Sequence, residues 1–174
     1  FIRKYIGIPK GITKKYQDRI KYVSGVYTVA DGIYLVSHST PHLEQIGKKE
    51  MMYQKTKLGW KPDNFCHEQS LVLDTDGGYF CKECYNLKLS ETYIIRRPNI
   101  INEVKAAFPN KKITALIGGF HIFKHPEAEI RELAKLIQET GIERIYTGHC
   151  SKERGYRILR EELGDMAGQF YVGM

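Results

Sequence analysis

Two short segments end in glycine and are then followed by histidine, a pattern that can place an imidazole ring at the end of a strand. Residues 145–147 precede Gly148-His149, and residues 113–117 precede Gly118-Gly119-Phe120-His121. Imidazole is the commonest protein ligand for metals and titrates near neutral pH, so either ring suits metal binding or proton transfer. The sequence predicts that His121 and His149 end neighbouring strands, at the edge where open α/β sheets place their sites. The alternatives are a buried histidine bonded to a carbonyl for His149, and a loop histidine that only packs for His121.

Residues beside these histidines could bind the rest of a ligand. The helix expected after Ser151 directs unpaired N–H groups and a partial positive charge toward His149, which favours an anionic group such as phosphate. Ser151 is also expected to cap that helix. Gly119 has no side chain, so either a ligand or another segment of the chain could approach its backbone closely.

A third group of candidates lies earlier in the chain. His67 is followed by Glu68, and its ring could be a metal ligand or a solvated loop residue. Cys81 and Cys84 form a single C-x-x-C, and a four-ligand zinc site would need a second pair such as Cys66 with His67. A redox role is disfavoured, because no strand-to-helix junction places Cys81 at a helix N-terminus.

The elements that must position these residues follow from hydrophobic periodicity and breakers. The first half is rich in β-forming residues, and the second half alternates helical and strand patterns, which predicts an α/β or layered α+β domain. Ser37 to Trp60 is expected to be a long loop with at most a short helix, and Cys81 to Arg97 is left unassigned. Strands are predicted at residues 26–29, 32–36, 69–75, 79–80, 113–117, 144–147 and 170–172, and helices at 12–16, 99–108, 126–140 and 151–163.

Composition is that of an ordinary globular chain. Its 174 residues, with 42% hydrophobic and 27% charged side chains, predict a single domain with a substantial core. There is neither an apolar run of about 20 residues nor a signal-peptide pattern, so a cytoplasmic protein with reduced cysteines and no membrane partner is expected. The net charge of +7 suits an anionic small molecule. Because the basic residues are scattered and, from about Glu127 onward, interleaved with acids, a solvated basic surface is favoured over a nucleic-acid site.

Three motifs in the correct order carry a resemblance to a known family. The segments 63–73, Ala115–His121 and Ile145–Cys150 resemble the metallo-β-lactamase-fold hydrolases, in the branch that includes dihydropterin-type ribofuranosylaminobenzene phosphate synthases. The resemblance implies an αββα sandwich with one or two divalent metals, zinc first and iron or manganese as alternatives. In such enzymes the metal lowers the pKa of a bound water until it becomes a nucleophile.

The resemblance also implies roles for particular residues. His149 falls on a metal-ligand position, His121 lines the pocket, and His67 lies close to where superfamily members place a ligand. Gly119 and Ser151, beside these histidines, are predicted to bind the substrate. No catalytic residue is assigned. The family's main motif, H-x-H-x-D-H, does not occur in the sequence, and no histidine stands between Cys81 and Arg97, where Cys-Ser-His is expected. Residues 1–174, which begin with Phe1, are therefore interpreted as one metallo-β-lactamase-like domain that lacks its N-terminal part.

Two functional hypotheses follow from the sequence. The first is a metal-dependent hydrolase of this superfamily that acts on a small, phosphate-bearing substrate through a metal-activated water. The second is a non-catalytic α/β binding protein that keeps the fold without a complete metal site, and the missing motifs favour it.

Overall fold

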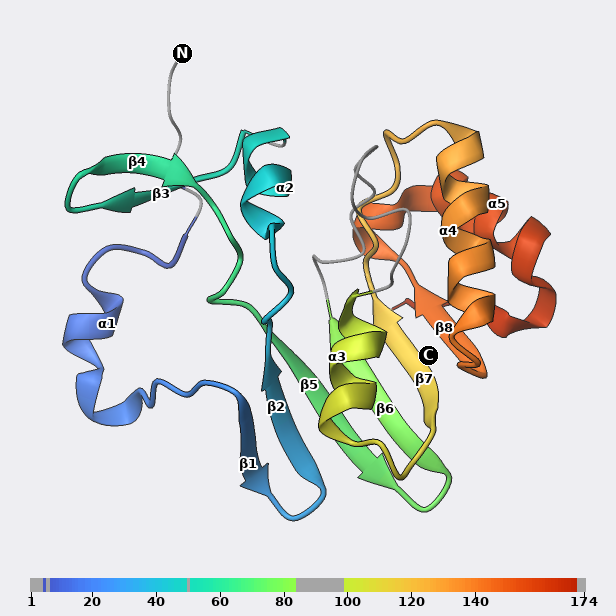
Figure 1. The fold of residues 1–174 in the computed structure, drawn as a ribbon, viewed down its shortest axis with the longest axis horizontal. Coiled ribbons are helices and arrows are strands. Elements are labelled where there is room, and N and C mark those ends of the chain that lie inside the picture. The colour runs from blue at the N-terminus through green and yellow to red at the C-terminus, as the bar shows by residue number, and fades with distance from the viewer. Residues whose placement is uncertain (1–4, 6, 50, 84–98, 172–174) are drawn as a thin grey trace.

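The computed structural model describes residues 5, 7–49, 51–83 and 99–171 (Figure 1). Among these residues the strands form one seven-stranded sheet and one separate two-stranded hairpin, which confirms the α/β class. In order across the large sheet, the strands are β1 (Val26–Ala30), β2 (Ile33–Ser37), β5 (Gln69–Thr75), β6 (Gly78–Glu83), β7 (Ile113–Gly118), β8 (Arg144–Thr147) and β9 (Ala167–Gln169).

The directions of the strands determine which residues meet at each edge of the sheet. Pairing is antiparallel from β1 to β6 and parallel from β6 to β9. As a result β2, β6, β7, β8 and β9 all run in one direction, and β5 begins where they end. The segments that follow β2, β7 and β8 and the segment that precedes β5 therefore share one edge of the sheet.

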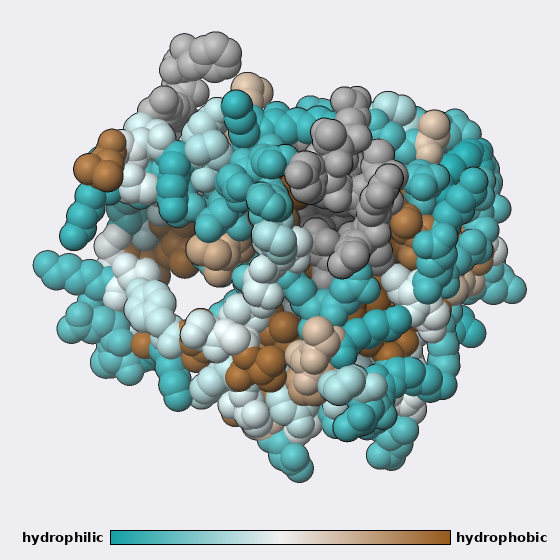
Figure 2. All heavy atoms as spheres, viewed as in Figure 1, coloured by the Kyte–Doolittle hydropathy of each residue, from teal (hydrophilic) through white to brown (hydrophobic). Residues whose placement is uncertain are grey.

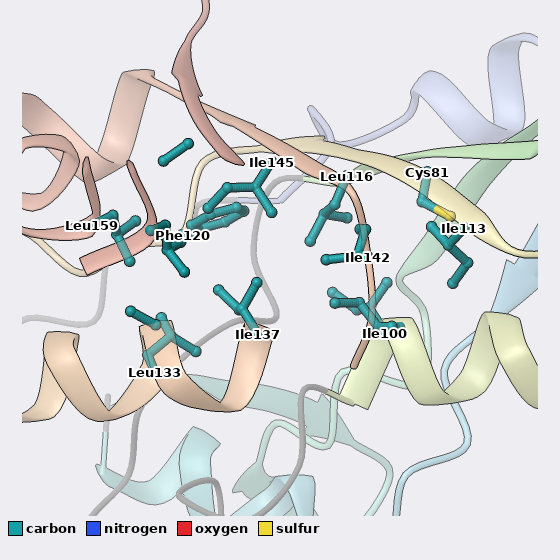
Figure 3. Close-up of a cluster of buried hydrophobic side chains, with 14 of the residues drawn as sticks. Cys81, Ile100, Ile113, Leu116, Phe120, Leu133, Ile137, Ile142, Ile145 and Leu159 are labelled. Atoms are coloured by element: carbon teal, nitrogen blue, oxygen red, sulfur yellow. The ribbon is translucent and has the colours of Figure 1, made fainter. Parts of the chain in front are cut away.

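Three helices bury the apolar stripes that the sequence predicts. They are α3 (Asn99–Ala107), α4 (Glu127–Glu139) and α5 (Lys152–Leu163). In Figure 1, α3 and α4 lie on the same face of the sheet, and α5 packs against α4 and β9. Side chains from the strands and all three helices form one core, part of which is drawn in Figure 3, including Ile100, Leu116, Leu133, Ile137, Ile145 and Leu159. In the described part of the chain no helix combines the length and the apolar character needed to cross a bilayer.

The insertion between β2 and β5 has a small core of its own. It contains α2 (Leu43–Lys49) and a hairpin of β3 (Tyr53–Thr56) and β4 (Gly59–Pro62), where a long loop with at most a short helix was expected. The prediction missed the hairpin, because its strands are largely exposed and polar and its turn lacks the Asn-Gly or Asp-Gly signal. A short helix, α1 (Ile12–Lys15), precedes the sheet and buries none of its residues.

The predicted last strand was wrong, and most of the unassigned stretch from Cys81 to Arg97 lies outside the described residues. The last described strand is β9, whereas Phe170 and Tyr171 of the predicted strand 170–172 are not in a strand and residue 172 lies outside the described residues. Pairing with β8 favours the small residues of β9, since an added Cβ on Gly168 would lie 2.7 Å from the Tyr146 ring. The undescribed part of the unassigned stretch runs from residue 84 to residue 97.

One carboxylate on α3 connects that helix to the end of β2. Glu103 accepts hydrogen bonds from the main-chain amides of Ser39 (2.9 Å) and Thr40 (2.8 Å) and from the Thr40 hydroxyl. Its other oxygen lies 2.8 Å from Nδ1 of His38, whose side chain is buried. Burial opposes ionisation of this carboxyl, but the hydrogen bonds from His38, Thr40 and Ser39 outweigh it. They hold the pKa of Glu103 below its ordinary value of 4.5.

We expect Glu103→Ala to lower the free energy of unfolding by about 3 kcal/mol at neutral pH, because two amides and His38 lose their acceptor. Urea denaturation would measure this, with Glu139→Ala, at an exposed position of α4, as the near-neutral control.

The contribution of Glu103 should also depend on pH. Since its folded pKa is depressed, the carboxylate stabilises the fold above pH 4.5, its ordinary pKa, and this stability is lost as the pH falls through the folded pKa. The difference between wild type and variant should therefore shrink in acid, and a difference that is constant with pH would contradict the ionised role.

Candidate functional site

His121 and His149 lie at the ends of neighbouring parallel strands, as the sequence predicts. Pairing of β7 with β8 runs to Gly118 opposite Thr147, and each strand is followed within three residues by its histidine. Adjacent strands are separated by about 4.8 Å, so the two turns are neighbours at the same edge of the sheet. His149 is exposed and His121 is half-buried with its Nδ1 atom buried, so His149 is the more accessible of the two residues.

Both histidines have a left-handed backbone conformation. The φ angle is 56° at His121 and 48° at His149. Residues other than glycine seldom adopt these positive values. Each such residue costs on the order of 1 kcal/mol or more, and the conformation persists only where surrounding contacts hold it. Residues under this kind of strain are enriched at binding and catalytic sites. The conformation is shared by His42, Met51, Phe65 and Lys152, so the case for this pair of turns rests on strain together with their neighbouring positions.

A buried hydroxyl connects the two turns. Oγ of Ser151 accepts the main-chain N–H of Phe120 at 2.9 Å and lies 2.6 Å from Oγ1 of Thr147. Both hydroxyl residues are fully buried. The expected helix cap is therefore not formed, because the Ser151 side chain makes no capping hydrogen bond to α5 and is used between the turns.

Two glycines, which have no side chain, allow close packing between the turn after β7 and the segment from Cys150 into α5. A Cβ added to Gly119 would lie 2.4 Å from Sγ of Cys150, and one added to Gly155 would lie 2.8 Å from Ile122. The sequence left open whether a ligand or another segment of the chain approaches Gly119. In the structure it is a chain segment, the one that contains Cys150. Binding of substrate by Gly119 and Ser151 stays a prediction, since both residues already make these contacts within the protein.

Sequence reasoning missed one histidine at this edge. His38 lies in the segment from Ser37 to Trp60 that was expected to be a loop, and it directly follows β2, which runs parallel to β7 and β8. Its ring is buried against Glu103, a carboxylate far along the chain. The sequence did show a histidine just after a strand-like run. Whether that histidine lies beside His121 and His149 depends on the directions of the strands, which the sequence does not give.

His67 flanks a strand that is not adjacent to the strands of the paired histidines. It precedes β5, three positions from β8 in the sheet, which separates the strand axes by about 14 Å. Its side chain is 62% exposed, and Nδ1 lies 3.6 Å from the carboxylate of Asp63. Its role as a metal ligand stays a prediction.

The donors in the described residues do not complete a metal site. Zinc is held by three or four protein ligands, and within the described ranges no group of three or more His, Cys, Asp or Glu side chains is arranged to hold an ion. Cys66 is exposed and Cys81 is buried in β6, while Cys84 lies outside the described residues. The described residues could therefore supply only some of the ligands that a metal ion needs.

The contact between Gly119 and Cys150 yields a testable prediction. We expect Gly119→Ala to lower the free energy of unfolding by about 2 kcal/mol, because the new methyl group overlaps the sulfur. In the double variant with Cys150→Ala the overlap is relieved, so the two effects should be less than additive. Gly77→Ala is the control, since its Cβ would meet only Thr75 Oγ1 at 4.0 Å. Strict additivity in thermal or urea unfolding would show that the turns are not in contact.

Comparisons with known proteins agree with the fold and leave the activity open. No family model matches the sequence. A 79-residue segment is 28% identical to 7,8-dihydropterin-6-methyl-4-(β-D-ribofuranosyl)-aminobenzene-5'-phosphate synthase of Methanocaldococcus jannaschii and spans 44% of this chain and 27% of that protein.

A solved structure provides the wider likeness. Tm1679, described as a metal-dependent hydrolase of the β-lactamase superfamily, superposes with a TM-score of 0.67 at 23% sequence identity, over 88% of this chain and 56% of that one. The chain thus spans little more than half of that structure and about a quarter of the curated relative. This likeness shows that the chain has the fold of the metallo-β-lactamase superfamily.

Proposed function

We propose that the chain forms part of the site of a metal-dependent hydrolase that acts on a small, phosphate-bearing substrate. The observation that carries the proposal is the pair of strained histidine turns, His121 and His149, held side by side at one sheet edge. The likeness to a protein described as a metal-dependent hydrolase supports the reaction class. The phosphate named in the curated relative, together with the net charge of +7, supports an anionic substrate.

The exposed and half-buried rings suggest different roles. His149 is exposed, so its ring is the better candidate to bind an ion, and half-buried His121 would line the pocket beside it. His149 begins a short 3-10 helix, η2 (His149–Ser151), and α5 follows it at Lys152. The main-chain N–H groups of the first turn of α5 would favour an anionic group of the substrate. Further donors beyond the described residues would have to complete the ion's coordination, with zinc, iron and manganese as candidates.

A second candidate function is binding without catalysis. It is favoured by the lack of any three-donor group in the described part of the chain. In this case the same edge would hold an anion through α5 and the neighbouring histidine, and no hydrolysis would occur.

The metal content distinguishes the two functions. We expect protein purified without chelator to contain zinc, iron or manganese, and His149→Ala to lower that content about tenfold or more, since one ligand is lost. Elemental analysis measures this, with His42→Ala as the control, because that exposed histidine faces Glu44 at 3.7 Å. Metal-free wild-type protein would favour the binding function.

Both candidate functions predict that an anion binds at this edge of the sheet, whether or not the protein contains metal. We expect inorganic phosphate at about ten times its Kd to raise the melting temperature by about 3 °C, as about 1.4 kcal/mol of binding energy is added to the folded state. The rise should be smaller in His121→Ala, and chloride at matched ionic strength is the control. An equal rise with chloride would show that phosphate has no specific site.

A further inference from the structure

Positive charge and exposed apolar surface are both concentrated in the first third of the chain. The first 62 residues contain twelve of the 27 Lys and Arg residues but only four of the 20 Asp and Glu residues. Ten of the twelve large hydrophobic side chains that are exposed in the described ranges lie between Tyr5 and Trp60. These segments include α1 and the β3–β4 hairpin, which lie at the end of the molecule opposite α4 and α5 (Figure 1). Figure 2 shows hydrophilic side chains projecting from this end, with small hydrophobic patches between them.

The hairpin has the most regular arrangement of the two kinds of side chain. Cross-strand pairing places Lys55 opposite Trp60 and Tyr53 opposite Pro62, so these side chains share one face. Tyr53, Lys55 and Trp60 are all exposed. The two turn residues are Lys57 and Leu58, and Leu58 is fully exposed at the tip. Residues 51–62 contain no acidic side chain.

The base of this hairpin is held firmly while its tip projects. A Cβ added to Gly47 of α2 would lie 2.1 Å from the carbonyl oxygen of Asp63, so the helix lies directly against the backbone after β4. The amide of Met52 donates to Gly47 at 2.8 Å, and the amide of Asp63 donates to Met52 at 2.9 Å. The turn points away from α2 (Figure 1). A supported hairpin therefore presents a leucine in solvent, with lysines and aromatic rings behind it.

We propose that the β3–β4 hairpin docks on an anionic phospholipid surface, with Leu58 entering the headgroup boundary and the lysines meeting lipid phosphates. Apolar burial and attraction of Lys to anionic lipids are the two sources of strength for contacts of this kind. Aromatic side chains such as Tyr53 and Trp60 favour the interfacial level between headgroups and acyl chains. The proposal departs from the expectation of no membrane partner, which was based on the lack of a segment long and apolar enough to span a bilayer, because a surface contact needs no such segment.

The hairpin fits a lipid surface better than a nucleic acid. Single strands bind through stacking of bases on aromatic faces and through lysines along a groove. An aliphatic side chain at the most exposed point of a turn adds nothing to either contact. It is, in contrast, the group that gains most from entering an apolar boundary.

The test is sedimentation of the full chain with vesicles. We expect binding to phosphatidylcholine vesicles that contain about one third phosphatidylserine, and little binding to pure phosphatidylcholine. Raising the salt from about 0.1 M to about 1 M should weaken it, because screening shortens the reach of the lysines. Lys57→Glu should weaken binding at least about fivefold, and Leu58→Ser about tenfold, without changing the melting temperature.

Two matched variants serve as controls. Lys135→Glu changes the net charge equally but lies at an exposed position of α4, and Leu73→Ser removes an exposed leucine from β5. Neither should alter vesicle binding. Equal loss in Lys57→Glu and Lys135→Glu would reduce the effect to net charge and overturn the proposal. Absence of vesicle binding would also overturn it, and so would binding of a single-stranded oligonucleotide that depends on Lys57 but not on Leu58.

Discussion

A buried serine hydroxyl is the contact on which the arrangement of the histidine turns depends. Ser151 accepts the amide of Phe120 and meets Thr147, and all of this takes place where water does not enter. An unmatched amide in such a place costs about 1–3 kcal/mol, so the turn after β7 is tied to the turn after β8. The energy of these contacts offsets the left-handed backbone at His121 and His149, which local preference alone would not hold.

The parts of the fold that could be predicted are those whose signal is local. β5, β7 and β8 and the three large helices have clear periodicity, and Gly141 and Gly164 stand just after helices with positive φ, where their positions predict helix ends. The parts that were missed depend on contacts across the chain. β9 is paired in register with β8, and α2 packs against the base of the hairpin.

The candidate site shows the same division. Its two histidines could be found from the sequence, because strand, glycine and histidine are consecutive. The pairing of His38 with Glu103 could not, because it joins residues that are far apart in sequence and depends on where α3 packs. Glycine 119 was recognised as a point of close approach, but only the structure shows that Cys150, and not a ligand, occupies the space.

The two halves of the chain differ in how charge is balanced. In the helical part, Arg131 meets Glu127, Glu161 and Glu162 at 2.5 to 2.7 Å, which joins α4 to α5 and raises the pKa of the guanidinium. The pairs are partly exposed, so they add little stability. They neutralise the acidic side chains locally, and the net positive charge is left to the segments around α1 and the hairpin.

The insertion between β2 and β5 leaves and re-enters the sheet at paired residues, Ser37 and Gln69. Its two ends are therefore separated by about 5 Å, the width of one strand pair. A segment that is joined in this way can be shortened, lengthened or exchanged without a change of register in the sheet. Evolution, or a protein engineer, could thus replace the part from α2 to β4 as a cassette, provided that the contacts of residues 38–40 with Glu103 are kept.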